Sequence, residues 1–137
     1  MVILYPYVQG DLYEIDMRAG DDIGDEVTEH TGPSWTLKDE GEVLACFGIC
    51  NIYGGVGTAW AFVSDKARHH GASLPKAMIA KLKECFDVMK FHRLQTVVRI
   101  DSKEYQRFVE LIGFQREGLL RKATPSKQDV FLYSMVT

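Results

Sequence analysis

Hydrophobic residues follow two different periods along this chain, and the difference separates strands from helices. Short runs rich in β-branched and aromatic residues predict strands at residues 2–8, 34–38, 43–53, 58–63, 94–100, 114–120 and 130–136. From Leu74 to Lys90 the apolar residues instead recur at every third or fourth position, which is typical of an amphipathic helix. A shorter helix is expected from Lys103 to Ile112, ended by Gly113. The strands at 34–38 and 43–53 are expected to form a hairpin that turns at residues 39–41, and those at 114–120 and 130–136 a closing hairpin.

The N-terminal part of the pattern is less regular. Pro6 lies in the first predicted strand and cannot donate a backbone hydrogen bond, so this strand is expected at a sheet edge. Asp11 is then expected to cap a short helix that runs to about Ala19. The acidic segment 20–33, which Pro33 closes, is either a helical turn or a loop.

The order of these elements defines the fold class. The strand that ends at Val63 is followed by a helix and then by the strand from Leu94, so these two strands should run parallel through a right-handed crossover. We predict one α/β (α+β) domain, residues 1–137, with a mixed, mostly antiparallel sheet of six to seven strands and helices on both faces. Ligands bind at the carboxyl ends of parallel strands, which places Val63 and the expected loop 64–73 beside Ile100 and Asp101.

Composition narrows the function by exclusion. The chain has 137 residues, 46% apolar and 26% charged, as expected of one soluble globular domain, and no apolar run has the length of a membrane span. Its net charge of −3 gives no general attraction to nucleic acid or to a membrane surface. Cys46, Cys50 and Cys85 lack the spacing of a zinc site and are interpreted as small buried hydrophobes. We therefore expect no metal, no nucleic acid and no membrane partner.

The junction between the strand ending at Val63 and the helix starting near Ser73 is the main candidate for a binding site. The backbone N–H groups of residues 69–74 should point at one spot there, and the positive end of the helix favours an anion at that spot. Arg68 adds a fixed positive charge, and Gly71 lets a ligand approach the backbone closely. A phosphate group is the natural ligand for such a junction.

This junction resembles the acetyl-CoA motif of the GNAT N-acetyltransferases, Val-x-x-x-x-(Arg/Gln)-x-x-Gly-x-(Gly/Ala). Val63, Arg68 and Gly71 match three of its positions at the family's spacing, and Ser73 stands at the fourth. The resemblance extends over roughly residues 34–136.

A second family motif is matched by Gly113-Phe114 followed by Glu117-Gly118. The resemblance implies a GNAT-like domain that uses acetyl-CoA as acyl donor and an amine as acceptor. The residues that it implies at the cofactor are Phe62, Val63, Arg68, His69, His70, Gly71, Ala72, Ser73 and Asp101.

Acetylation of an amine needs a base to remove a proton and an acid to protonate the departing thiolate. Several family members carry a glutamate on the strand that here spans residues 58–63, and this chain has none there. Many members carry an acid tyrosine at the position of Val109, so Tyr105, one turn earlier, is the candidate acid here. The candidate bases, which the sequence does not separate, are Glu42, Asp65, His69, His70 and Asp101.

Two functions are compatible with these residues. The first is an acetyl-CoA-dependent N-acetyltransferase; Arg121 after the Glu-Gly pair is similar to the protein N-terminal and ribosomal-protein branch, which favours a protein amine as acceptor. The alternative is a catalytically inactive GNAT-like binding protein, because the usual base and acid are missing and the chain also resembles small GNAT-like proteins of phages that enter the virion or act on the host. We expect a monomer or homodimer in the cytoplasm, or, for a phage protein, in the host cytoplasm or virion.

Overall fold

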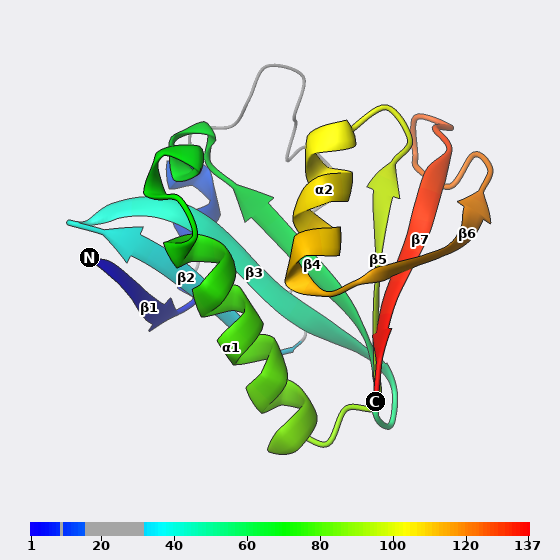
Figure 1. Ribbon diagram of the computed structural model, residues 1–137, viewed down its shortest axis with the longest axis horizontal. Helices are drawn as coiled ribbons and strands as arrows, with labels where there is room; N and C mark the ends of the chain where they lie inside the picture. The colour runs from blue at the N-terminus through cyan, green and yellow to red at the C-terminus, as the bar shows by residue number, and fades with distance from the viewer. Residues whose placement is uncertain (9, 16–31) are drawn as a thin grey trace. The chain divides into compact units, whose positions relative to one another are not determined.

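The computed structural model describes residues 1–8, 10–15 and 32–137 (Figure 1). In this part of the chain seven strands form one sheet in the order β1-β2-β3-β4-β5-β7-β6. The strands are β1 Val2–Pro6, β2 Ser34–Asp39, β3 Glu42–Tyr53, β4 Val56–Val63, β5 Arg93–Arg99, β6 Gln115–Leu120 and β7 Val130–Val136. The helices are the 3-10 helices η1 Asp11–Glu14 and η3 Asp65–His70 and the α-helices α1 Ser73–Asp87 and α2 Lys103–Ile112. The predicted mixed, mostly antiparallel sheet is confirmed.

Contacts divide the described residues into two compact units. We call residues 1–50 with 59–77 the N-terminal unit, and residues 51–58 with 78–137 the C-terminal unit. The N-terminal unit contains β1, β2, most of β3, the second part of β4, η3 and the first residues of α1. The C-terminal unit contains the first residues of β4, the remainder of α1, and β5, α2, β6 and β7.

In the N-terminal unit, β1, β2 and β3 form an antiparallel meander. β1 stands first in the strand order, which confirms that the strand with Pro6 lies at an edge. Glu40 and Gly41 join β2 to β3, and their φ values of 50° and 82° both lie in the left-handed region. A two-residue type I′ turn requires this conformation, so the predicted hairpin is confirmed.

A β-bulge in β3 decides which side chains enter the core of this unit. Leu37 lies opposite Ala45, whereas the next residue of β2, Lys38, lies opposite Val43, so β3 carries one extra residue. The extra residue brings Val43 and Cys46, three positions apart, into one buried cluster. The half-buried aromatic residues packed against this cluster are Tyr7, Trp60 and Phe62.

Asp11 does not cap a helix in the way that the sequence suggested. It is the first residue of η1, a single 3-10 turn, and its Oδ2 accepts hydrogen bonds from the backbone N–H of Val8 (3.0 Å) and from the hydroxyl of Thr36 (2.8 Å). The carboxylate therefore accepts from the preceding segment and from β2 and does not accept from the N–H groups of a following helix. The rest of the predicted helix and most of the acidic segment fall on residues 16–31, outside the described part.

The C-terminal unit contains the parallel strand pair. Val56 lies opposite Arg93 and Thr58 opposite Gln95 in a parallel ladder, as predicted for strands separated by a helix. β7 pairs antiparallel with β5 on one side and with β6 on the other (Figure 1). The closing hairpin of β6 and β7 is therefore also confirmed.

The two α-helices follow the predicted patterns. The apolar stripe of α1 is confirmed at the buried residues Leu74, Met78, Leu82 and Cys85. The helix ends at Asp87, three residues before the predicted Lys90, and Met89 beyond it is exposed. α2 has the predicted bounds and ends at Gly113, whose φ of 122° and N–H bonds to the carbonyls of Val109 and Glu110 close its last turn. Among the helices of the described ranges, none is both long and apolar enough to cross a membrane.

Candidate cofactor site

The carboxyl end of β4 leads into α1 through a 3-10 helix. Ser64 Oγ accepts a hydrogen bond from the N–H of Lys66 (3.2 Å), and its carbonyl accepts one from Ala67 (3.0 Å), so η3 begins directly after β4. The expectation of an open loop over residues 64–73 is therefore wrong for the six residues of η3. The predicted start of the following helix near Ser73 is confirmed.

Buried residues anchor this junction within the N-terminal unit. The exposed fractions of Val63, Ser64 and Ala67 are only 7%, 2% and 3%. The N–H of Ser64 donates to the carbonyl of Leu44 on β3 over 2.7 Å. These contacts hold η3 against the sheet, so the residues after it leave from a fixed position.

The first turn of α1 offers backbone donors to an anion. The N–H of Lys76 bonds to the carbonyl of Ala72 (3.1 Å), and Pro75 has no N–H group. Ser73 and Leu74 therefore supply N–H groups of the kind that a helix leaves without an internal partner. α1 has 15 residues, so the positive end of its dipole adds to this preference for negative charge.

The chain turns from η3 into α1 at Gly71. Its φ of 58° and ψ of −132° lie in a region that residues with a Cβ atom strongly avoid. A Cβ atom added there would meet no other described residue within 4 Å, and Gly71, Ala72 and Ser73 are all exposed. A ligand can therefore approach this backbone without displacing a side chain of the described residues.

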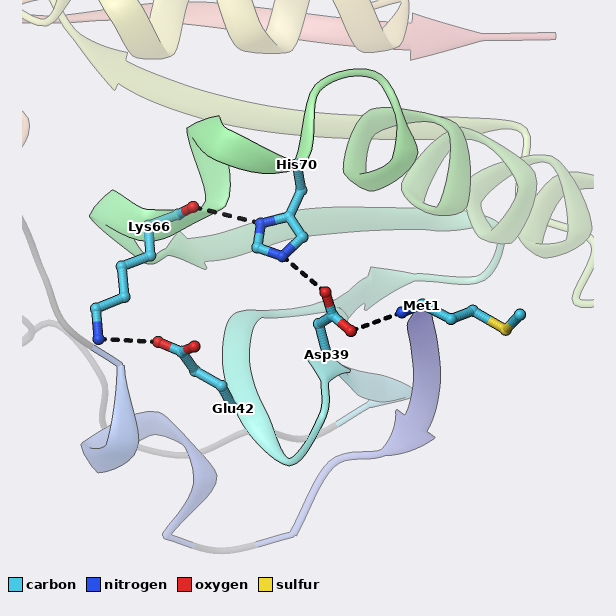
Figure 2. Close-up of polar contacts among 5 residues, drawn as sticks. All are labelled: Met1, Asp39, Glu42, Lys66 and His70. Atoms are coloured by element: carbon cyan, nitrogen blue, oxygen red, sulfur yellow. Dashed lines mark hydrogen bonds and ion pairs between the residues drawn. The ribbon is translucent and has the colours of Figure 1, made fainter.

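His70, the last residue of η3, is held on both sides of its ring (Figure 2). Its Nε2 lies 2.9 Å from Asp39 Oδ2, and its Nδ1 lies 3.4 Å from the carbonyl oxygen of Lys66. Asp39 Oδ1 also lies 2.7 Å from the amino group of Met1, and Lys66 Nζ lies 2.9 Å from Glu42 Oε1. The hydrogen bond from the Met1 amino group lowers the pKa of Asp39, and His70 lowers it further. A hydrogen bond from His70 to Asp39 and an ion pair from Lys66 to Glu42 thus join η3 to the β2–β3 hairpin.

Most of the sequence-predicted cofactor residues fall on this junction. Phe62 is half-buried and Val63 buried at the end of β4, and the exposed residues 71–73 follow η3. The side chains of Arg68 and His69 lie outside the described part.

The remaining candidates, Asp101 and Tyr105, belong to the C-terminal unit. Asp101 is exposed just after β5, with its Oδ1 3.6 Å from Arg99 Nε, and Tyr105 is half-buried in the first turn of α2.

A further residue that shapes this region is Gln106, which the sequence did not single out. Its buried amide donates to the carbonyls of Arg99 (3.1 Å) and Ile100 (2.9 Å) and so fixes the end of β5. Glutamine is an ordinary helix residue, so no local signal marks this role.

The motif from Gly113 to Glu117 has structural roles. Gly113 ends α2 in a left-handed conformation, and Phe114 is 5% exposed in the core. Glu117 lies at a bulge of β6 and forms an ion pair with Arg93 over 2.7 Å. The hydrogen bond from Arg93, and then the one from Ser134, lower the pKa of Glu117. The motif therefore helps to fix the β5–β7–β6 sheet and the end of α2.

Two of the three cysteines, Cys46 and Cys85, are unsuited to nucleophilic catalysis. Cys46 and Cys85 are fully buried, and burial raises the pKa of each thiol to about 11. Cys50 is half-buried. The interpretation of Cys46 and Cys85 as small core residues is confirmed. Within the described ranges, no three His, Cys, Asp or Glu side chains are grouped as a metal site would require.

The fold of this chain is that of the GNAT acetyltransferases, as comparison with solved structures shows. The spermidine/spermine N-acetyltransferase SpeG from Vibrio cholerae, in mutant forms, superposes with a TM-score of 0.71 at 13% identity, over 99% of this chain and 95% of that one. A GNAT-family acetyltransferase from Bacillus anthracis gives a TM-score of 0.64 at 22% identity, over 75% of this chain and 65% of that one. The ribosomal-protein-S5-alanine acetyltransferase from Vibrio fischeri gives 0.69 at 15% identity, over 77% and 61%.

The chain thus spans less than two thirds of the length of the Vibrio fischeri and Bacillus anthracis proteins. No family model and no curated protein matches the sequence.

Proposed function

We propose that this chain is an acetyl-CoA-dependent N-acetyltransferase that acts on a primary amine. The observation that carries the proposal is the junction from β4 through η3 to α1, where an exposed glycine backbone and a helix N-terminus offer donors to an anion. The same junction carries the acetyl-CoA motif in sequence, at Val63, Arg68 and Gly71. The acetyltransferase fold, matched over nearly the whole chain, supports this assignment.

The proposed cofactor residues contribute either backbone N–H groups or positive charge. The N–H groups of Ser73 and Leu74 and the backbone of Gly71 would hold the pyrophosphate, because all three lie on the open side of the junction or in the first turn of α1. Arg68 would add positive charge. Bound acetyl-CoA would supply a thioester carbonyl that a neutral amine can attack.

The proton transfers are assigned to the C-terminal unit. Glu42, His70 and Asp101 each contact another side chain, at 2.9 Å for Glu42 and His70 and at 3.6 Å for Asp101. We keep Asp101 as the proposed base, because its contact is the longest of the three and its side chain, at 72% exposed, is the most open to a substrate, and Tyr105 as the proposed acid. An alkyl amine with a pKa of about 10.4 is protonated at neutral pH, so a base is needed before attack.

A protein amino terminus is the proposed acceptor, and a polyamine is the competing one. Of the similar structures, one is a ribosomal-protein-S5-alanine acetyltransferase and another is a spermidine/spermine N-acetyltransferase. An acetylation assay should therefore offer both an alanine-initiated peptide and spermidine. The release of free CoA measures turnover in either case.

Thermal unfolding with acetyl-CoA tests the binding half of the proposal. A ligand at 100 times its Kd stabilises the folded state by about 2.7 kcal/mol, which for a chain of 137 residues raises Tm by about 9 °C. Gly71→Glu should abolish the rise, because it places a strained residue and a carboxylate at the phosphate position. Gly54→Glu, in an exposed turn with open space around the new Cβ atom, is the matched control and should keep it. If the unchanged chain shows no rise at millimolar acetyl-CoA, the enzyme proposal is wrong.

That outcome would favour a non-catalytic GNAT-like binding protein. The specific observations on its side are Val109 at the usual acid position and the missing glutamate on β4. A chain that binds acetyl-CoA but releases no CoA with any amine would support the same alternative.

A further inference from the structure

We propose that Asp39 is a positioning residue for the cofactor junction, because it holds His70 and thereby fixes η3 and the start of α1. This inference rests on the proposed acetyl-CoA site. The sequence placed His70 among the cofactor-binding residues and the candidate bases. Here His70 has a structural role instead. The ring would act as a brace within the protein, and the junction would bind phosphate through its backbone.

The contact joins a strand end to the end of η3. Asp39 is the last residue of β2, and its position is fixed because it pairs with Val2 on one side and Glu42 on the other. His70 is followed directly by Gly71, where the chain turns into α1. The 2.9 Å contact between their side chains spans 31 positions in sequence, and each side chain is only 23% exposed. A displacement of His70 would therefore move the backbone on which the proposed site depends.

Both ring nitrogens of His70 face acceptors, the carboxylate of Asp39 and the carbonyl of Lys66. A neutral imidazole carries one N–H and can satisfy only one of them, whereas the protonated ring donates to both. The charged groups around the ring are Asp39 and, next to it, the amino group of Met1, with the Lys66 ammonium turned toward Glu42 (Figure 2).

The pair also controls charge beside an anion site. Without His70, one oxygen of the Asp39 carboxylate would lose its partner close to the junction, and an exposed carboxylate oxygen repels phosphate. With His70 in place, Asp39 is shared between the His70 ring and the Met1 amino group. Loss of the His70–Asp39 contact would thus lower the affinity for acetyl-CoA in two ways, by displacing the backbone of the junction and by exposing negative charge beside it.

Calorimetric titration with acetyl-CoA, on variants first shown to fold by circular dichroism, tests the inference. His70→Ala and Asp39→Asn should each weaken binding about tenfold, the low end for a lost hydrogen bond to a charged group. His70→Gln keeps a neutral donor near Nε2 and should restore binding to within about threefold of the unchanged chain. Lys66→Gln is the matched control, because it removes the other ion pair of η3 while the backbone carbonyl that faces His70 remains.

Hydrogen exchange separates positioning from a general loss of stability. Hydrogen exchange of the amides of residues 65–71 should be faster in His70→Ala, with no change in β5 and β7.

If the unchanged chain binds acetyl-CoA while His70→Ala and Asp39→Asn bind it equally well, the inference is overturned and the proposed function stands. Unchanged exchange over residues 65–71 in His70→Ala also overturns it. If the unchanged chain does not bind, the proposed function fails and the inference fails with it.

Discussion

Tyr133 carries a buried hydroxyl whose removal tests how α2 is fixed to the sheet. The residue is 0% exposed on β7, and its hydroxyl accepts hydrogen bonds from Nε (3.2 Å) and Nη2 (3.0 Å) of Arg116 and donates one to Glu110 on α2 (3.3 Å). The Arg116 guanidinium also stacks over the ring of Phe131 at 3.8 Å and donates to Gln106. One hydroxyl thus joins β6 and β7 to the helix that carries Tyr105.

Tyr133→Phe should cost about 1.5–2 kcal/mol of unfolding free energy. A hydrogen bond to a charged partner contributes about 1.5–3 kcal/mol, and the lower part of this range applies because Arg116 and Glu110 reach solvent and can bind water after the substitution. The ring itself stays in place, so no cavity term is added. With about 2.1 cal/mol/K of unfolding entropy per residue over 137 residues, 1.5 kcal/mol corresponds to a fall in Tm of about 5 °C.

Differential scanning calorimetry measures this fall directly. Tyr53→Phe is the matched control, since it makes the same chemical change at a residue that is 73% exposed, and its Tm should stay within about 1 °C of the unchanged chain. A Tyr133→Phe Tm equal to that of the control would refute the reasoning, because it would mean that the buried hydroxyl adds nothing that water does not replace. A fall far beyond 5 °C would refute it too, since it would require a packing change that the retained ring does not predict.

Two further predictions concern the core and the helix end. A thiol reagent at pH 8 should modify Cys50 quickly and leave Cys46 and Cys85 unmodified until the chain unfolds, because both are buried thiols with a pKa raised to about 11; equal rates for all three, read by mass spectrometry, would contradict this. Gly113→Ala should lower the unfolding free energy by about 1–2 kcal/mol, because φ is 122° there and the new Cβ atom would lie 3.2 Å from Met135 Cε; chemical denaturation that shows no loss would contradict it.

The strands and α-helices were predictable because local patterns specify them. The helix from Lys103 to Ile112 was placed at its observed bounds, since a period of 3–4 residues and a following glycine act over short distances. The Glu40–Gly41 turn was visible for the same reason. η3 was missed because its polar sequence has no hydrophobic period, and it depends on the Ser64 cap and on Gly71.

The contacts that shape the candidate site were not predictable, because they join residues far apart in sequence. Asp39 and His70 are 31 positions apart, and neither has a local signal for the other. Asp11 was expected to cap its own helix, yet Thr36, 25 positions away, is its partner. Hydrophobic periodicity reports which face of an element is buried and does not report which polar groups meet.

The two motifs that led to the family resemblance therefore carry different information. The second motif has structural roles: Gly113 ends a helix, Phe114 lies in the core and Glu117 fixes a strand. Its presence therefore predicts the fold and gives no information about catalysis. The Gly71 junction acts through its backbone, so it bears on phosphate binding and is compatible with many side chains around it. Neither motif requires an acid at position 109 or a base on β4. Binding of acetyl-CoA and transfer of its acetyl group are thus separate properties of this chain, and only an assay of CoA release, made beside the binding measurement, distinguishes an enzyme from a binding protein on the same fold.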